Sequence, residues 1–191
     1  TLSGKNDIRS IFICKDNKIW ACTYSNGFSL FENGVFYKMP NDTNLFLISA
    51  HGIIEDEKGH FWISTNKGLI EVDKKSLLNY HQTKSPVYYQ HYDTKNGFIT
   101  NEFNGGCQPC NSKLSNGYFV FPSLNGLVVF HPEKINKITP KNDFFINEVE
   151  ADNKTIFFND SVTLSRDYER IKFKIDFPYF RQLDYRDCGP T

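Results

Sequence analysis

The sequence predicts an all-β protein made of repeated units of short strands and tight turns. Three observations lead to this fold class. The 191 residues include 18 Phe and 10 Tyr but a single Met, a composition typical of strands rather than helices. Asn-Gly pairs recur along the chain, and they supply the positive φ angles that two-residue hairpin loops require. One apolar pattern, HFWISTNKGLIEVD at residues 60–73, also occurs more than once.

Three stretches carry this pattern: CKDNKIWACTYSNGFSLF from Cys14, DEKGHFWISTNKGLIEVD from Asp56 and LSNGYFVFPSLNGLVVFHP from Leu114. The aligned positions are Trp20, Trp62 and Val120, the turn residues Asn17, Gly59 and Gly117, and the later glycines Gly27, Gly68 and Gly126. We expect each unit to form two hairpins in series. Four short strands in a unit of about 42 residues are typical of a β-propeller blade, whereas the coils of a β-helix are shorter.

Alternation within one strand predicts how the units pack. Phe61 and Ile63 point to one face, while Trp62 and Ser64 point to the other, so the strand must be covered on both sides. We expect it to lie between stacked sheets. The hairpin turns are predicted at Asn26-Gly27, Asn33-Gly34, Asn116-Gly117 and Asn125-Gly126. An insertion before the third unit, VYYQHYDTKNGFITNEFNGGCQPCNSK, is expected to hold one strand and a long loop.

After a polar linker, TPKND, the chain alternates again. In RIKFKIDF the residues Ile171, Phe173, Ile175 and Phe177 share one face and charged residues the other, which predicts a half-buried antiparallel strand. The whole chain carries 22 basic and 22 acidic residues, so no excess charge favours nucleic acid or an anionic membrane surface. No apolar run approaches the ~20 residues that span a bilayer.

Residues 7–137 resemble the last blades of the two-component regulator propeller. The resemblance rests on Asp56, Gly59 and Trp62 in a D-x-x-G-x-x-W pattern, on YDTKNGFITNEFN and on NGYFVFPSLNGLVVFHPEKI. It is looser in the last unit, at Gly97-Phe98-Ile99, Val120 and Pro122. FINEVEADNKTI and IKFKIDFPYFRQLDYR are similar to the β-sandwich called the three-tyrosine (Y-Y-Y) domain, which follows the propeller in the same sensors.

The expected domains are therefore 1–137, the C-terminal blades of a propeller, and 138–191, the N-terminal part of an immunoglobulin-like β-sandwich. A propeller needs 4–8 blades and a sandwich about 100 residues. Only about three blades and half a sandwich are visible, so the chain reads as a fragment. An open arc would expose a strand edge at residues 5–13.

The resemblance implies a non-catalytic part of the periplasmic sensor region of a Bacteroides-type hybrid two-component histidine kinase. It implies an oligosaccharide ligand, signal relay, a homodimer through the sandwich in the full-length protein, and membrane attachment only through transmembrane segments absent here. Two alternatives remain open: a fragment of a propeller polysaccharide lyase or glycoside hydrolase, and scaffold blades without ligand contact. The catalytic domains of a kinase are not expected in this chain.

No catalytic, cofactor or metal site is predicted, and the ligand-binding residues are unknown. Cys107 and Cys110 have the spacing of half a zinc site, but no second ligand pair accompanies them. Their loop leads into a strand rather than a helix, so loop cysteines are favoured over a disulfide and over metal binding. The disulfide state of Cys107, Cys110 and Cys188 stays open. If Asp16 and Asn17 are the central residues of their turn, Cys14 faces Ile19 and Cys22 faces Ile11, out of register for a disulfide.

The remaining candidates for functional residues are an aromatic cluster and two carboxylates. Tyr88, Tyr89, His91 and Tyr92 could stack on a carbohydrate, but packing is the favoured role for aromatic strands in β proteins. Tyr88 and Tyr92 share one face, Tyr89 and His91 the other, so only one set is expected to be exposed. Asp93 and Glu102 flank a glycine loop, and we expect turn and capping carboxylates there rather than acid–base catalysts.

Overall fold

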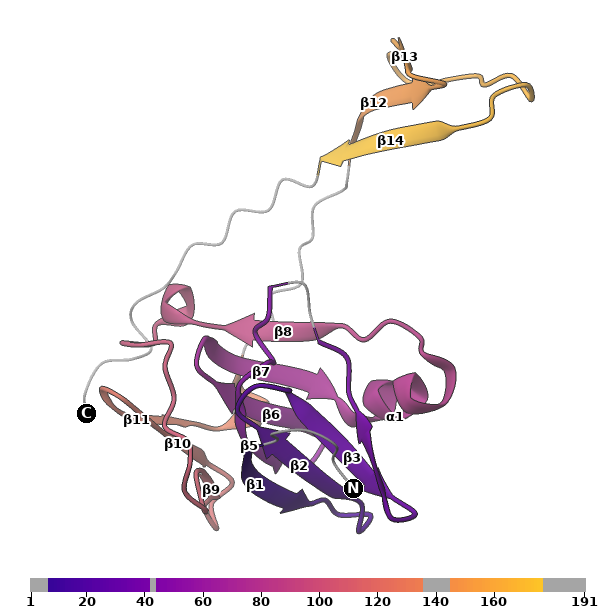
Figure 1. Ribbon diagram of the computed structural model, residues 1–191. Coiled ribbons are helices and arrows are strands. Elements are labelled where there is room, and N and C mark those ends of the chain that lie inside the picture. Colours follow the sequence, from indigo (N-terminus) through magenta and orange to yellow (C-terminus); the bar gives the residue numbers. More distant parts are fainter. Residues whose placement is uncertain (1–6, 42–43, 136–144, 177–191) are drawn as a thin grey trace. The chain divides into compact units, whose positions relative to one another are not determined.

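The computed structural model describes residues 7–41, 44–135 and 145–176. These residues form two compact units, which are treated separately below: 7–135 and 145–176. Fourteen strands, one α-helix and two short 3₁₀ helices make up the described part of the chain. The predicted all-β class is confirmed (Figure 1).

The first unit contains three antiparallel sheets. In the first, the strand order is β1 (Ile8–Ile13), β2 (Ile19–Thr23), β3 (Phe28–Glu32) and β4 (Val35–Lys38). In the second it is β5 (Ala50–Glu55), β6 (His60–Thr65), β7 (Gly68–Asp73) and β8 (Tyr89–Tyr92). In the third it is β9 (Ser112–Lys113), β10 (Phe119–Ser123) and β11 (Gly126–Phe130). Each sheet is a meander, in which successive strands are neighbours.

Strand register confirms the repeat position by position. Ile13 pairs with Ile19, Glu55 with Phe61 and Lys113 with Phe119. The three opening turns also share a left-handed residue, with φ of 59° at Asn17, 82° at Gly59 and 85° at Gly117. Side chains other than Gly and Asn rarely adopt this conformation.

The second sheet lies between the other two, as the alternation in β6 predicts. Phe61 and Ile63 belong to a core cluster shared with Trp20 and Phe28 of the first sheet. Trp62, on the opposite face, packs with Phe119 and others in a second cluster shared with the third sheet. All three β6 side chains are buried, so both faces of this sheet contribute to stability.

The segment between β7 and β9 contains a helix in addition to the predicted insertion. An α-helix, α1 (Lys74–Thr83), precedes β8; Asp73 caps its start and Leu77 packs into the first core cluster. The strand and long loop that were expected follow: β8, then η1 (Thr94–Asn96), then a long loop. The helix was not predicted, because a ten-residue segment of mostly polar residues with one buried side chain gives only a weak helical periodicity.

Residues 103–111 of this loop, called the strap, run across the three sheets. The Phe103 amide donates to the Thr65 carbonyl (3.1 Å), and the Asn104 amide to Pro122 (2.9 Å). The Gln108 side chain accepts from the amide of Ile11 (3.2 Å) and donates to its carbonyl (2.9 Å). The edge of β1, predicted to be exposed, is therefore capped at its middle; residues 5 and 6 lie outside the described part.

One predicted register was wrong. Cys14 pairs with Lys18, whose carbonyl accepts from the Cys14 amide at 3.0 Å, and Cys22 pairs with Ser10 rather than Ile11. The turn spans three residues and ends at Asn17 in the left-handed conformation, so the pairing shifts by one position relative to a two-residue turn. Cys14 and Cys22 are free thiols.

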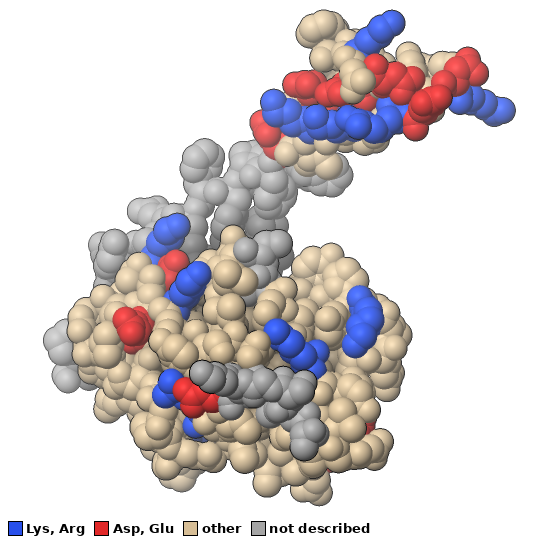
Figure 2. Space-filling view, in the orientation of Figure 1, with Lys and Arg blue, Asp and Glu red and all other residues tan. Residues whose placement is uncertain are grey.

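The second unit is a three-stranded sheet of order β13 (Lys154–Ile156), β12 (Phe145–Ala151) and β14 (Ile171–Asp176). One face carries charged rows joined by Lys172–Glu150 (3.4 Å) and Lys174–Glu148 (3.6 Å) (Figure 2). Ile171, Phe173 and Ile175 share the other face but remain exposed. The expected strand is thus antiparallel and alternating, and its apolar side chains are 39% to 55% exposed, whereas Val149 and Ala151 of β12 on the same face are buried. Phe177 and Cys188 lie outside the described part.

Candidate functional site

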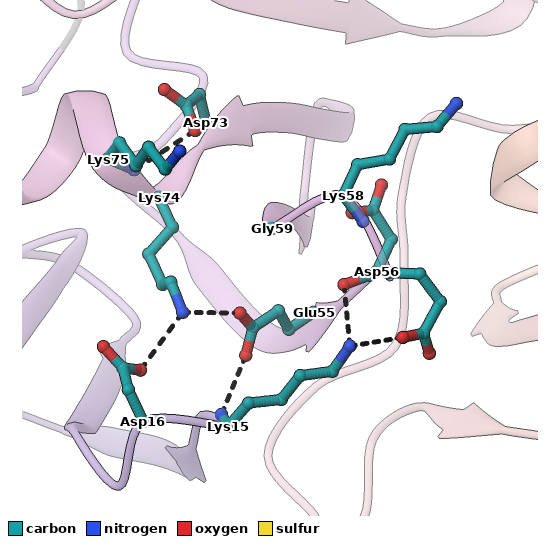
Figure 3. A pocket seen from close by; sticks show the side chains of 10 residues that line it. Lys15, Asp16, Glu55, Asp56, Lys58, Gly59, Asp73, Lys74 and Lys75 are labelled. Carbon is teal, nitrogen blue, oxygen red and sulfur yellow. Dashed lines mark hydrogen bonds and ion pairs between the residues drawn. The ribbon is translucent and has the colours of Figure 1, made fainter.

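A polar pocket of about 340 Å³ lies where turns of the first two sheets meet the start of α1 (Figure 3). The residues that line it come from the β1–β2 turn, the end of β5 with its following turn, and the first residues around α1: Lys15, Asp16, Glu55, Asp56, Glu57, Lys58, Gly59, Asp73, Lys74 and Lys75. Nearly every wall residue is charged. The pocket could therefore hold a polar ligand only in competition with its own ion pairs.

Glu55 is the centre of these ion pairs. Its carboxylate is buried and accepts from Lys74 Nζ at 2.6 Å and from the Lys15 amide at 2.9 Å. Lys74 also reaches Asp16 at 3.1 Å. Burial alone would lower the pKa of Lys74, but its bonds to Glu55 and Asp16 outweigh this and raise the pKa. These ion pairs join the first sheet to the second.

Glu57 extends the connection to the third sheet. Its exposed carboxylate pairs with Lys113 of β9 and with Lys15 of the first turn. Together Lys113 and Lys15 lower the pKa of Glu57 to about 2. Charged side chains from all three sheets therefore meet at this end of the unit, although exposed pairs of this kind contribute little each to stability.

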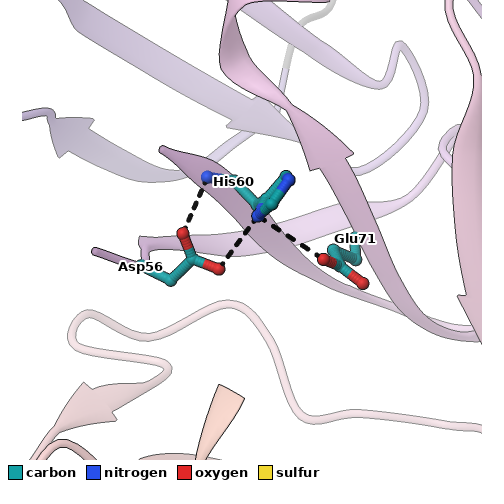
Figure 4. A group of neighbouring side chains, drawn as sticks. All are labelled: Asp56, His60 and Glu71. Carbon is teal, nitrogen blue, oxygen red and sulfur yellow. Dashed lines mark hydrogen bonds and ion pairs between the residues drawn. The ribbon is translucent and has the colours of Figure 1, made fainter. Parts of the chain in front are cut away.

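A second polar group, Asp56, His60 and Glu71, lies on the Trp62 face of the second sheet (Figure 4). Their ligand atoms all lie within 4.8 Å of one another. His60 Nδ1 is 3.2 Å from Asp56 Oδ2 and 3.6 Å from Glu71 Oε1. Two carboxylates and an imidazole are a donor set that a divalent cation could use.

Hydrogen bonds within the chain already occupy these carboxylates. Asp56 Oδ1 accepts from the amides of Lys58 (2.9 Å) and His60 (2.8 Å), and Oδ2 accepts from the indole of Trp62 (3.1 Å). Burial raises the pKa of Asp56, but these donors outweigh it and the net shift is downward. Tyr92 donates to Glu71 Oε2 at 2.8 Å. The D-x-x-G-x-x-W pattern is therefore a turn lock: Asp56 fixes the turn around Gly59 and anchors Trp62.

The other two repeat units lack a carboxylate at the position of Asp56. Cys14 and Leu114 occupy the place of Asp56, as shown by their amides, which donate to Lys18 and Tyr118 as Asp56 donates to His60. In the first sheet the buried indole nitrogen of Trp20 makes no hydrogen bond of normal geometry with a described residue, although it lies near enough to the Cys14 thiol to act on it weakly. Burial is also the main cause that raises the pKa of the Cys14 thiol.

Cys107 and Cys110, which are close in sequence, are free thiols in a loop. Cys107 is exposed and Cys110 buried, both free, and the loop leads into β9 as expected. Cys110 donates to the carbonyl of His51 at 3.1 Å. Burial raises the pKa of Cys110 and brings that of Cys22 to about 12. Neither buried thiol has the lowered pKa of a reactive cysteine.

Most side chains of the aromatic cluster pack against other residues of the fold. Tyr89 contacts the first core cluster, and Tyr92 stacks on Trp62 with ring centroids 5.4 Å apart. Tyr88 and Gln90 are exposed on one face, whereas Tyr89 and His91 on the other face are half-buried, so exposure is confined to one face as expected. Tyr88, just before β8, is 84% exposed. It stands alone and makes no platform with the other three.

The two flanking carboxylates do not meet as an acid–base pair. Asp93 caps η1 by accepting from the Lys95 amide at 2.8 Å, within a capping box completed by Asn96. This confirms the predicted capping role. The Glu102 carbonyl accepts from the Leu124 amide at 3.1 Å, which ties the loop to the β10–β11 turn.

Sequence reasoning missed the Glu55–Lys74 pair and the Gln108 cap on β1. These partners are 19 and 97 residues apart in the chain. No local motif signals such contacts, since they depend on how the sheets stack. The Thr65 hydroxyl, which donates to the Gly68 carbonyl at 2.8 Å, was also missed, although it has counterparts at Thr23 and Ser123. The repeated hydroxyl before each turn was a signal that could have been found.

No family model matches the chain. It is 28% identical over 191 residues to histidine kinase P4 of Formosa agariphila, an alignment that covers 96% of this chain and 12% of that protein. The chain therefore spans only a small part of this relative.

The fold is similar to extracellular domains from B. thetaiotaomicron. The domain of BT3049, described as a hybrid two-component system, matches with a TM-score of 0.52 and 22% identity, over 84% of this chain and 20% of that chain. Two structures of the BT4673 domain match with TM-scores of 0.56 and 0.55, both at 20% identity, over 73% and 77% of this chain and 20% and 22% of those chains. At these identities the matches establish a shared fold.

No helix in residues 7–41, 44–135 or 145–176 combines the length and the apolar character needed to cross a membrane.

Proposed function

We propose that this chain is part of the periplasmic sensor region of a hybrid two-component histidine kinase. The observation that carries the proposal is the stack of repeated meanders, whose fold matches extracellular domains of two-component proteins. The 28% identity to a histidine kinase along nearly the whole chain supports the same assignment. In this proposal residues 1–137 are blades of a propeller and residues 138–191 begin the Y-Y-Y sandwich.

The role proposed for these residues is binding and relay without chemistry. The carboxylates that could serve in acid–base catalysis are engaged elsewhere: Asp56 in its turn lock, Glu55 with Lys74, and Asp93 at a helix cap. The inter-sheet ion pairs support a scaffold in which the repeats move together. An oligosaccharide is the proposed ligand class, and these blades contribute to the wall that surrounds it.

The second unit supports the relay part of the proposal. Its sheet has one charged face and one apolar face, on which the β14 side chains are exposed while Val149 and Ala151 of β12 are buried. One half of a β-sandwich has the same division into a polar and an apolar face. We propose that the remainder of the sandwich covers this face and that the complete domain forms the homodimer contact in the full-length protein.

The decisive experiment compares the natural gene product with the enzyme alternative. The full-length protein, reconstituted in vesicles, is incubated with a panel of oligosaccharides, and both autophosphorylation and sugar cleavage are measured. We expect one sugar class to change autophosphorylation without being cleaved. A gene that ends without a transmembrane segment, together with cleaved sugar, would instead identify a lyase or hydrolase. Unchanged phosphorylation with every sugar would reject the oligosaccharide ligand.

A further inference from the structure

The strap, residues 103–111, carries two cysteines in different surroundings. Residues 105–109 are exposed, and Cys107 is among them, whereas Cys110 is only 3% exposed. The other free cysteines in the described part of the chain are buried. Cys107 is therefore the described cysteine that a soluble reagent can reach.

Cys110 anchors the strap to the second sheet. Its thiol donates to the carbonyl of His51 at 3.1 Å. Its sulfur lies directly against Gly52 of β5, where a side-chain carbon would collide with it. Two residues earlier in the chain, Gln108 bonds both backbone groups of Ile11. The strap is thus held at two neighbouring points, on β5 and on β1.

The docked strap also covers polar atoms that have no partner. Arg9 Nε, His51 Nδ1 and Asn111 Nδ2 are buried and make no hydrogen bond with a described residue. Asn111 belongs to the strap itself. The other two groups lie under its glycines, since a Cβ on Gly105 would collide with the His51 ring and a Cβ on Gly106 with the Arg9 guanidinium. Burying polar groups without partners costs free energy that water would restore, and this cost favours release of the strap.

Release of Cys110 leaves the His51 carbonyl satisfied. The Ser10 hydroxyl donates to the same oxygen at 2.6 Å, so no buried acceptor would lose its last partner. Cys107 is three residues away from Cys110, the spacing of C-x-x-C redox pairs. The pKa of the Cys110 thiol is raised mainly by burial and also by the charge of a Cys107 thiolate. The two sulfur atoms are therefore within electrostatic reach of each other.

We propose that Cys107 and Cys110 form a reversible disulfide, and that its formation releases the strap from β1 and β5. This inference rests on the proposed function, because the periplasm is the compartment that supplies a disulfide oxidant. It adds a redox-sensitive site to that function. An exposed disulfide of this kind is one that cellular thiols can reduce again.

Thiol–disulfide exchange supplies the steps. The Cys107 thiolate attacks a soluble disulfide, binds one half of it and expels the other half as a thiolate. Cys110, once out of its buried position, loses its proton to water. Its thiolate attacks the Cys107 sulfur, closes the new S–S bond and expels the second half. The protein loses two protons and two electrons, and the oxidant becomes two thiols.

Peptide mass mapping and hydrogen exchange test the proposal together. The natural polypeptide that contains this chain is equilibrated with either reduced or oxidised glutathione, and the remaining thiols are then blocked. In oxidised glutathione the segment 107–110 should lose two hydrogens, while Cys14 and Cys22 stay free. The Ile11 amide should exchange at least about tenfold faster in the oxidised protein. The Ile63 amide, in a strand paired on both sides, should stay slow in both states.

Two variants separate the steps. Cys107→Ser, at an exposed position, should keep the Ile11 amide slow even in oxidised glutathione. Cys110→Ser keeps a hydroxyl that can donate to the His51 carbonyl, and it should accumulate glutathione on Cys107 as a stable mixed disulfide. Faster exchange of Ile11 in Cys107→Ser would overturn the proposal, because glutathione would then act at another place.

Other outcomes also overturn it. One is a glutathione adduct on Cys107 of the natural sequence that never closes onto Cys110. Another is a disulfide that joins either strap cysteine to Cys22 or Cys188. A third is a closed Cys107–Cys110 bond that leaves exchange at Ile11 unchanged. The measurement needs neither a sugar nor a kinase segment, so it can fail while the sensor assignment stands, and a failure to respond to oligosaccharides would not affect it.

Discussion

The second and third sheets follow the same repeat but differ in what covers them. In the second sheet both faces are buried, and β8 covers the outer edge. In the third sheet only the face with Phe119 and Phe121 is buried, while Leu127 is exposed. The difference shows that the repeat determines strand and turn geometry, whereas the neighbours of a sheet determine how much each residue contributes to stability.

The largest expected effect separates equivalent positions in the two sheets. Trp62→Ala removes a fully buried side chain and should lower the free energy of unfolding by about 4 kcal/mol. Val120→Ala, at the same place in the third sheet but only half-buried, should lower it by less than about 1.5 kcal/mol. Urea unfolding of the two variants measures the difference. Equal losses would mean that the third sheet is covered as well as the second.

The turns and strands of these sheets could be predicted because their causes are local. A left-handed residue at Asn17, Gly59 or Gly117 is required by the turn itself. The alternation of side chains around Trp62 reflects burial on both faces of the sheet. The register at Cys14 could not be predicted, because two-residue and three-residue turns are both compatible with the letters CKDNK.

The candidate site was less accessible to prediction for a physical reason. The Glu55–Lys74 pair and the strap depend on the distance between stacked sheets, which no short window of sequence contains. Asp56 was recognised as part of a pattern, but its role became clear only from the indole of Trp62, six residues later in the chain. Long-range polar contacts are thus the part of this molecule that the repeat does not encode.

Glu55→Gln tests whether the pocket residues link the first two sheets. The substitution removes a buried charge that Lys74 faces at 2.6 Å, and should lower the free energy of unfolding by about 2 kcal/mol. The matched control is Glu57→Gln, since Glu57 is exposed. It should cause a smaller loss that disappears at about 1 M salt, where surface charges are screened. Equal losses that both vanish in salt would contradict an inter-sheet role for Glu55.

Asp56→Asn tests the turn lock through pH. The folded state lowers the pKa of Asp56, so the carboxylate stabilises the fold above its unfolded pKa of about 3.9 and this contribution is lost as the pH falls through the folded value. The variant should be less stable than the natural chain at pH 7, and the gap should narrow below about pH 4. Unfolding curves from pH 2 to 7 measure it. A constant gap would show that Asp56 acts only through its shape.

Thr65→Val tests the hydroxyl that precedes each turn. It keeps the side-chain shape but leaves the buried Gly68 carbonyl without the 2.8 Å bond from Thr65, and should cost about 1 kcal/mol. Ser123→Ala removes the corresponding 3.0 Å bond to Gly126 in the third sheet. There the loss should be smaller, because water can reach the exposed Gly126. A larger loss at Ser123 would reverse the comparison between the two sheets.

The smallest expected effect is a gain in stability in the first sheet, where Cys14 takes the place of Asp56. Cys14→Asn places a carbonyl oxygen where Asp56 stands in the second sheet, so that the indole of Trp20 gains an acceptor. Asn adds no charge near Asp16 and Glu55, which Asp would. We expect a stabilisation of about 0.5 kcal/mol, measured by urea unfolding against the Trp20→Phe background, where no N–H remains. A gain that persists in that background would come from the turn itself, and not from a hydrogen bond between the residue at position 14 and the indole of Trp20.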